Sequence, residues 1–483
     1  MGEWSYNPND LYSLVHGAEF IVIDFETTGL HQLKDEPVSF SVLTNKGVAF
    51  FPIAPYRSID SAVTQPGLDR DVAGRILREE TGGIPYLGHN LKFDAHYLYK
   101  IAGFYPRHTI DTQVGYWLLH EEGELGLKAI ATRLLQKQLP DYKDIEAQAS
   151  ELIKSEILAH REQYVNEQKL VGRKKTDARK EVSDLFPLRN ATIFDIPIEW
   201  IAPYCVKDVL LTYWLWVAYV RPGLEAEGLL DYFYSVEMPF AKALWGMEQR
   251  GFQIDSNRLL QVEKELTVQS IDLENQFLST VGRDVNLRSN QQLQELFFNE
   301  MGLEPIGKET KGGNPSLDEK ALLQLHIEYG KKTPVFDILL QYRQLRKIIG
   351  TYTSSLVDLA YNGRVYTRFR HCGTVTGRLS SESPNCQNLV KQIKTAFVAP
   401  PGKLILEADY SQAELRVLAD RTQDDLLLDA YRHGKDIHTQ TMEKLGLTDR
   451  RLAKVCNFGG SIIWFISKKK RSCVSSAVKS SLR

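Results

Sequence analysis

The stretch IVIDFETTGL, residues 21–30, decides how the rest of the chain is interpreted. Apolar residues dominate positions 19–25, which is typical of a buried strand, and Asp24 and Glu26 stand two positions apart there. Both side chains therefore project from one face of the strand. Like charges on a buried strand are costly unless something compensates them, and a divalent cation is the usual partner.

Two further polar pairs follow this strand. Asn90 and Asp94 are four residues apart in GHNLKFD, and Tyr204 and Asp208 are four apart in YCVKD. In a helix each pair shares one face. Taken separately, each carboxylate also fits a helix cap or a surface charge. Together they supply what phosphodiester hydrolysis needs: oxygen ligands for two cations about 3.5–4 Å apart, and a phenol beside the attacking water.

In this order the three segments resemble the motifs of the DEDD-type 3′→5′ exonucleases. The tyrosine marks the subclass that proofreads for family A DNA polymerases. The resemblance implies an α/β, RNase H-like exonuclease domain over residues 1–222, two Mg²⁺ or Mn²⁺ ions, and a single-stranded DNA 3′ end as substrate. It implies catalytic and metal-ligand roles for Asp24, Glu26, Asp94 and Asp208, with Tyr204 beside the water and Asn90 in contact with DNA.

Strand-like and helix-like runs alternate through this first region, which favours an α/β domain. Residues 38–43 and 48–53 are expected strands, and TNKG between them predicts a hairpin turn. Residues 141–190 are densely charged, with a weak helical stripe and a basic cluster between residues 173 and 180. We interpret them as an inserted, solvent-facing helical element, with DNA contact as the alternative.

A mainly helical pattern follows over residues 223–360. An apolar stripe between residues 230 and 247 ends at Gly251, where a helix is expected to stop. A second stripe, between residues 339 and 356, has Arg343, Arg346 and Lys347 among its members. This stripe fits core packing, or basic side chains that lie along the phosphate backbone of DNA.

Two capping boxes predict helix starts in the same region. Ser289 precedes Gln292 by three residues, and Ser316 precedes Glu319 by three. The segments MEQRGF, NLRSNQQL and YRQLRK resemble the thumb region of family A polymerases.

The segments TVTGRLSS and PNCQN, within residues 374–388, resemble a part of those polymerases that contacts the primer–template duplex. The resemblance implies DNA-binding roles for Thr376, Arg378, Asn385, Gln387 and Asn388. A guanidinium suits charge-assisted contacts with DNA.

ADYSQAELR, residues 408–416, resembles motif A of the family and follows an expected strand at residues 404–408. Asp409 would end that strand and bind Mg²⁺. Glu414 would exclude the ribose 2′-OH and so select deoxynucleotides.

Residues 450–459 resemble motif B, the fingers helix that binds dNTP. Arg450, Lys454 and Phe458 are spaced by four, so they lie along one helical face. Two cations there suit a triphosphate, and the phenyl ring suits stacking on the sugar and base. His438, upstream of this helix, is a further expected dNTP-binding residue.

Composition sets limits on this reading. Hydrophobic residues make up 43% and charged residues 25%, which is ordinary for a globular chain. The net charge of −2 excludes a general basic coat for nucleic acid. Five cysteines without a Cys-x-x-Cys pair argue against a disulfide framework or a zinc ribbon and fit a reducing cytoplasm. We see no secretory signal and no membrane-spanning run.

The resemblance stops after Gly459, where the family expects Tyr-Gly in place of Ile462-Ile463. Residues 460–483 hold six basic and no acidic residues, so the rest of the chain carries about −8. We hypothesise that this aberrant Ser/Lys-rich tail is an out-of-frame or intron read-through translation. Residues 361–459 would then be an incomplete α+β palm with the start of the fingers, lacking motif C, and the expectation is that this chain alone has no useful polymerase activity.

The sequence therefore predicts part of a phage-type family A replicative polymerase, in the cytoplasm of an infected bacterial host. Its proofreading domain is expected to be intact, and primer–template DNA and dNTPs are its expected partners. Three alternatives stay open: a stand-alone 3′→5′ exonuclease, an inactive DNA-binding fragment, and half of a split polymerase completed by a second polypeptide. No membrane partner is expected.

Overall fold

The computed structural model describes residues 4–58, 67–167, 182–306, 309–310, 312–330 and 333–445. It contains two compact units, Met1–Val398 and Ala399–Arg483. Arg450, Lys454, Phe458 and the predicted tail at 460–483 lie outside the described residues. No described helix is long and apolar enough to cross a membrane.

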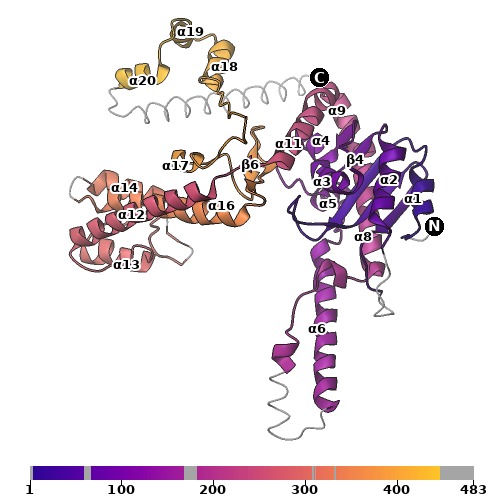
Figure 1. The fold of residues 1–483 in the computed structure, drawn as a ribbon. Coiled ribbons are helices and arrows are strands. Elements are labelled where there is room, and N and C mark those ends of the chain that lie inside the picture. Colours follow the sequence, from indigo (N-terminus) through magenta and orange to yellow (C-terminus); the bar gives the residue numbers. More distant parts are fainter. Residues whose placement is uncertain are drawn as a thin grey trace. The chain divides into compact units, whose positions relative to one another are not determined.

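A five-stranded sheet lies in the N-terminal part of the first unit (Figure 1), and its strand order is β3-β2-β1-β4-β5. The strands are β1 (Ile21–Thr27), β2 (Pro37–Thr44), β3 (Gly47–Pro52), β4 (Tyr86–Gly88) and β5 (Thr109–Asp111). β1 runs antiparallel to β2 and parallel to β4. The predicted hairpin is confirmed, because Thr44 pairs with Gly47 across a two-residue turn.

Helices pack on both faces of this sheet. They are α1 (Pro8–Val15), α2 (Arg70–Thr81), α3 (Leu91–Ala102), α4 (Thr112–Leu119), α5 (Leu127–Leu135) and α8 (Ile198–Leu215). Ile23 and Phe25 enter a core with residues of α1, α2 and α3. Val22 enters a second core with Val209 of α8. Because side chains alternate along a strand, Asp24 and Glu26 follow Val22 onto the face that α8 covers.

The predicted insertion contains a long helix, α6 (Tyr142–Glu167), which projects away from the sheet (Figure 1). Near its start Ala149 and Ile153 are buried against Ile193, whereas Leu158, further along, is 49% exposed. The helical, solvent-facing interpretation is therefore confirmed for the described part. The basic cluster between residues 173 and 180 lies outside the described residues.

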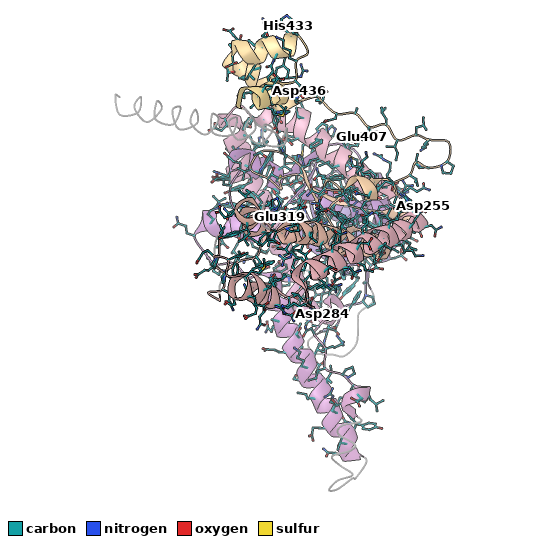
Figure 2. All side chains as sticks on the ribbon, turned by 90° about the vertical axis from the view of Figure 1, so that its left-hand side faces the viewer. Asp255, Asp284, Glu319, Glu407, His433 and Asp436 are labelled. Carbon is teal, nitrogen blue, oxygen red and sulfur yellow. The ribbon has the colours of Figure 1, made fainter. Side chains whose placement is uncertain are left out.

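The region after the sheet is helical, as expected. Its helices are α9 (Arg221–Ala226), α10 (Leu230–Tyr232), α11 (Met238–Arg250), α12 (Ser256–Val281), α13 (Asn290–Gln294), α14 (Glu319–Tyr329), α15 (Val335–Ile348) and α16 (Ser354–Leu359). Asp255, labelled in Figure 2, caps α12 by accepting from the Arg258 N–H at 3.1 Å. Ser289 caps α13, as predicted, by accepting from the Gln292 N–H at 3.3 Å. The second predicted cap is wrong: α14 begins at Glu319, and its N-cap residue is Asp318 rather than Ser316.

The first apolar stripe is only partly buried. Phe233 and Leu244 are in the core, but Val236, Phe240 and Met247 are exposed. A π-helical turn at Phe233–Glu237 separates α10 from α11. Its wider turn shifts the phase of the apolar face relative to a regular helix. α11 ends before Gly251, as predicted, and that glycine has a φ of 57°.

The second stripe is core. Leu339, Tyr342 and Leu356 are at most 1% exposed. Arg343 donates to the Leu317 carbonyl and, at 2.8 Å, to Oδ1 of Asn290. This arginine joins three segments of the helical region, so its contacts are structural.

Short strands follow in the same unit: β6 (Phe252–Gln253) pairs with β7 (Arg364–Val365), and β8 (Arg368–Arg370) pairs with β9 (Ser380–Glu382). They are followed by α17 (Lys391–Lys394).

The second unit is described over residues 399–445 and contains α18 (Ala413–Thr422), α19 (Asp425–Arg432) and α20 (Ile437–Leu445). The expected strand at residues 404–408 is wrong for this structure. Leu404 is 95% exposed and Leu406 is 90% exposed. Apolar composition favours a strand only where a neighbouring strand supplies backbone hydrogen bonds and a face to pack on, and no described strand pairs with this segment.

Candidate active site

Asp24 and Glu26 lie near the carboxyl end of β1, at the middle of the sheet. Ser41 and Ser39 of β2 stand opposite them in the register, so small hydroxyl side chains flank the two carboxylates. Cys205 of α8 donates from Sγ to Oε1 of Glu26 at 3.0 Å. The helix that covers this face therefore contacts the carboxylate pair directly.

Asp94 is held against β1 by the backbone. Its Oδ1 accepts from the Phe25 N–H, which lies between Asp24 and Glu26, at 2.9 Å. Asn90 differs from the sequence prediction, because α3 begins after it. Asn90 caps the helix with a φ of 60°, a left-handed conformation that asparagine tolerates. Its side chain is exposed, so it is available to a ligand.

Asp208 and Tyr204 are four residues apart on α8, as expected. Asp208 is buried and Tyr204 is half-buried. Burial, followed by the negative charge of Glu26, raises the pKa of the Tyr204 phenol. This tyrosine therefore stays protonated at neutral pH and acts as a hydrogen-bond donor or acceptor.

Lys128 of α5 is a residue that sequence reasoning missed. Its ammonium forms an ion pair with Oδ1 of Asp208 and lies 4.3 Å from the centre of the Tyr204 ring. No spacing pattern marks this lysine, because it is about 80 residues away from both partners along the chain. Burial lowers its pKa to about 8, against the attraction of Asp24.

The carboxylates repel one another. Burial raises the pKa of Asp24 to about 6, although Lys128 opposes the rise. Burial and then the charge of Asp24 raise the pKa of Glu26 to about 8. Burial and Asp24 also raise the pKa of Asp94 well above its usual range. A cation bound among these groups would reverse all three shifts.

These residues fit a divalent cation by their chemistry, since they offer carboxylate oxygens in a site that is short of positive charge. Among the described histidine, cysteine, aspartate and glutamate side chains, no three are already arranged as a metal-ligand set.

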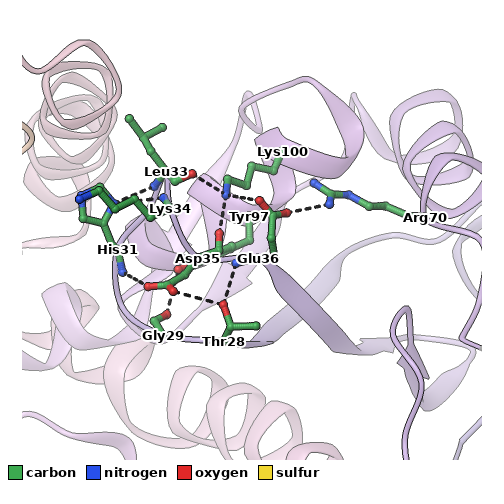
Figure 3. Close-up of polar contacts among 10 residues, drawn as sticks. All are labelled: Thr28, Gly29, His31, Leu33, Lys34, Asp35, Glu36, Arg70, Tyr97 and Lys100. Atoms are coloured by element: carbon green, nitrogen blue, oxygen red, sulfur yellow. Dashed lines mark hydrogen bonds and ion pairs between the residues drawn. The ribbon is translucent and has the colours of Figure 1, made fainter. Parts of the chain in front are cut away.

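Polar contacts fix the loop that follows β1 (Figure 3). Asp35 accepts from the His31 N–H at 2.7 Å and from the Thr28 hydroxyl at 3.2 Å. A Cβ on Gly29 would lie 2.5 Å from Oδ2 of Asp35, so the close approach requires glycine. Lys100 of α3 donates to the Leu33 carbonyl at 3.1 Å, which ties the loop to the helix that carries Asp94.

A cavity of about 300 Å³ lies next to this site. Exonuclease residues that line it include Leu30, Asn90 and Gln113, and β8 adds Arg368 and Arg370. Both arginines contact Glu382, at 2.6 Å and 3.5 Å. The cavity therefore combines a polar wall from the exonuclease region with a wall of ion-paired charges from strands about 280 residues away in sequence.

The residues expected to bind primer–template DNA lie on one segment of the first unit. Thr376, Arg378, Asn385, Gln387 and Asn388 all have exposed side chains. Asn385 also shapes its own loop, since its Oδ1 accepts from the Ser381 hydroxyl at 3.2 Å and from the Gln387 N–H at 3.1 Å.

The remaining described site residues belong to the second unit. Asp409 and Glu414 are exposed, Asp409 in the extended segment and Glu414 in the first turn of α18. His438 is only 3% exposed in the first turn of α20, where its N–H donates to Oδ1 of Asp436 at 3.0 Å.

Comparison with known proteins agrees with this architecture. Residues 256–472 match the model of the family described as DNA polymerase family A, and residues 5–218 match the model described as 3′-5′ exonuclease. The polymerase match includes residues 460–472, the first part of the predicted aberrant tail.

Several bacterial polymerases are similar in sequence. DNA polymerase I of Treponema pallidum is 30% identical over 91% of this chain and 44% of that protein. DNA polymerase I of Chloroflexus aurantiacus is 30% identical over 95% of this chain and 46% of that protein. The thermostable DNA polymerase I of Thermus filiformis is 40% identical over 48% of this chain and 30% of that protein. The chain spans less than half the length of these curated relatives.

The fold is also similar to a solved structure, the POL domain of Pol1 from M. smegmatis in complex with DNA primer-template and dNTP. The TM-score is 0.65 at 21% identity, over 94% of this chain and 70% of that one. The fold and the matches define a protein that joins an exonuclease region to a polymerase region. Residues 5–218 belong to the 3′-5′ exonuclease family and residues 256–472 to DNA polymerase family A, and the chain is similar to bacterial DNA polymerase I over most of its length.

Proposed function

We propose that this chain removes nucleotides from DNA 3′ ends by the two-metal chemistry of the tyrosine-bearing DEDD exonucleases. The observation that carries the proposal is the meeting of β1 with two helices at the carboxylates: Asp94 of α3 accepts from the Phe25 N–H between Asp24 and Glu26, and α8 contacts Glu26 through Cys205. α8 supplies Tyr204 and Asp208 to the same side. Three segments far apart in sequence thus bring four carboxylates and a phenol into one region.

Asp24, Glu26, Asp94 and Asp208 would hold two Mg²⁺ or Mn²⁺ ions. Bound there, the ions would activate the attacking water and stabilise the leaving oxygen. Tyr204 would position that water through its hydroxyl group, because its raised pKa keeps the phenol protonated. The bond between the Phe25 N–H and Asp94 keeps one ligand fixed before the substrate arrives.

The DNA 3′ end would reach the carboxylates past the cavity beside them. Asn90 would contact the strand there, and Arg368 and Arg370 offer positive charge for its phosphates. We place the expected single-stranded 3′ end in this cavity.

A gel assay with a 5′-labelled primer, single-stranded or annealed to a template, tests the proposal. The wild-type chain should shorten the primer with Mg²⁺ or Mn²⁺ and should not do so in excess EDTA. Asp24→Ala should abolish shortening, whereas Asp71→Ala, an exposed aspartate on α2, should leave it unchanged. Equal shortening by the Asp24→Ala variant and the wild type would contradict the proposed site.

The match of residues 256–472 to the polymerase family favours a second function, templated DNA synthesis. Asp409 would bind a metal, Glu414 would exclude the ribose, and His438 together with the expected motif B residues Arg450, Lys454 and Phe458 would bind the dNTP. The exposed residues from Thr376 to Asn388 would hold the primer–template.

Primer extension with all four dNTPs tests this second function in an Asp24→Ala background, where shortening does not obscure it. Extension that disappears in Asp409→Ala supports the assignment. Extension that requires a second polypeptide supports a split polymerase, and no extension under either condition leaves only the exonuclease. A phage-type origin is part of the same proposal.

A further inference from the structure

A lysine ammonium lies among the acidic residues of the candidate exonuclease site. Lys128 forms an ion pair with Asp208, and its ammonium lies 4.3 Å from the centre of the Tyr204 ring. The side chains of Lys128 and Asp208 are only 16% and 12% exposed. Two residues with proposed roles in hydrolysis therefore share one partly buried cation.

A carboxylate taken out of water needs a partner, and breaking a buried pair leaves an uncompensated charge. The ammonium meets that need at Asp208. It also attracts the face of the Tyr204 ring, since an aromatic face is negative. Lys128 thus orients both residues of α8 from a different helix, α5.

The same oxygen of Asp208 is what a divalent ion would use. A divalent ion at Asp208 would lie close to the ammonium, and two positive charges repel strongly in a partly buried site. The lysine stem is long and flexible, so its head group is able to move away without any backbone change.

We propose that Lys128 is a resident cation, which neutralises Asp208 and positions Tyr204 while no metal is bound and must leave Asp208 before a divalent ion binds there. Lys128 is a positioning residue in this scheme. The inference rests on the proposed exonuclease function, because it assumes that Asp208 is a metal ligand.

Metal binding, measured apart from catalysis, tests the exchange. Isothermal titration of the full chain with Mn²⁺, without DNA, gives the dissociation constant. Lys128→Met keeps most of the length of the side chain and removes its charge, so Mn²⁺ should bind about tenfold more tightly. Lys128→Arg retains the charge and should bind Mn²⁺ with an affinity close to that of the wild type. Lys137→Met, at an exposed lysine beyond the end of α5, should change nothing.

Thermal unfolding gives a second measurement. In EDTA the Lys128→Met variant should melt a few degrees below the wild type, because Asp208 loses its partner. Saturating Mn²⁺ should remove that difference, since the metal takes over the role of the ammonium. In an Asp208→Asn background, Lys128→Met should no longer tighten Mn²⁺ binding.

The outcomes separate the inference from the proposed function. Equal Mn²⁺ affinities for the wild type and Lys128→Met overturn the resident-cation role but leave the exonuclease proposal standing. Weaker binding by Lys128→Met also overturns it. Absence of Mn²⁺ binding by the wild type contradicts both the metal site and the inference.

Discussion

The backbone N–H of Phe25 donates a 2.9 Å hydrogen bond to Oδ1 of Asp94. This bond joins the strand of the first motif to the helix of the second, 69 residues later in the chain. It holds the Asp94 carboxylate close to Asp24, and burial followed by the charge of Asp24 raises the pKa of Asp94, whereas burial raises the pKa of Asp24. Holding these acidic groups together destabilises the fold, which is the pattern expected of a functional site.

Asp94→Asn and Asp94→Ala should separate the two roles of this residue. Both should lower exonuclease activity at least ~100-fold, because a metal ligand is lost. Asparagine keeps an acceptor for the Phe25 N–H, whereas alanine leaves that donor unpaired and should cost about 1–3 kcal/mol. Gel assays and urea unfolding measure the two effects. Equal unfolding free energies for both variants would show that the hydrogen bond contributes nothing.

Tyr204→Phe should keep the ring beside Lys128 and remove only the hydroxyl. We expect exonuclease activity to fall ~10–100-fold, with a melting temperature near that of the wild type. Tyr213→Phe is a matched control on α8, since that ring stacks on Phe20 with centroids 4.9 Å apart. If the two variants hydrolyse DNA at the same rate, the Tyr204 hydroxyl has no part in the reaction.

Glu248 of α11 is a buried carboxylate that contacts both α3 of the exonuclease region and β8. It is fully buried and accepts from Lys92, from His96 at 2.7 Å and from the Phe369 N–H at 2.6 Å. Glu248→Ala leaves all three partners unsatisfied and should lower the free energy of unfolding by about 3–5 kcal/mol. Urea unfolding measures this, with the exposed Glu79→Ala on α2 as control. A loss below about 1 kcal/mol would refute this role of Glu248.

His96 should make stability depend on pH. Burial lowers its pKa below the usual 6.5, even though Glu248 opposes the shift. Gln249 Nε2 lies 2.6 Å from Nδ1, and Glu248 lies 2.7 Å from Nε2. An amide donates and a carboxylate accepts, so one neutral tautomer satisfies both.

Because the folded pKa is the lower one, the unfolded chain takes up this proton first as the pH falls. The contribution of His96 is thus fully present above pH 6.5 and is lost progressively below it. Melting temperatures at pH 7.5 and 5.5 should differ more for the wild type than for His96→Gln. An identical drop in both proteins would assign the pH dependence to other groups.

The sequence predicted much of the first unit because its local patterns are strong. The hairpin at Thr44 and Gly47, the stop at Gly251 and the shared face of Tyr204 and Asp208 all depend on neighbours within a few residues. The stripe between residues 230 and 247 is helical, as predicted, but it is only partly buried because a π-helical turn interrupts the α-helical periodicity. The prediction of a strand at residues 404–408 was wrong because a strand depends on a neighbouring strand, which its own sequence does not supply.

Sequence alone indicated the family, the order of the motifs and the candidate carboxylates, since these follow from residue type and spacing. Tertiary structure alone decided what surrounds them. Lys128 and Cys205 reach Asp208 and Glu26 from other elements, and no spacing rule connects them. Burial and charge proximity, which set the pKa values of the site, exist only once β1, α3, α5 and α8 are packed together.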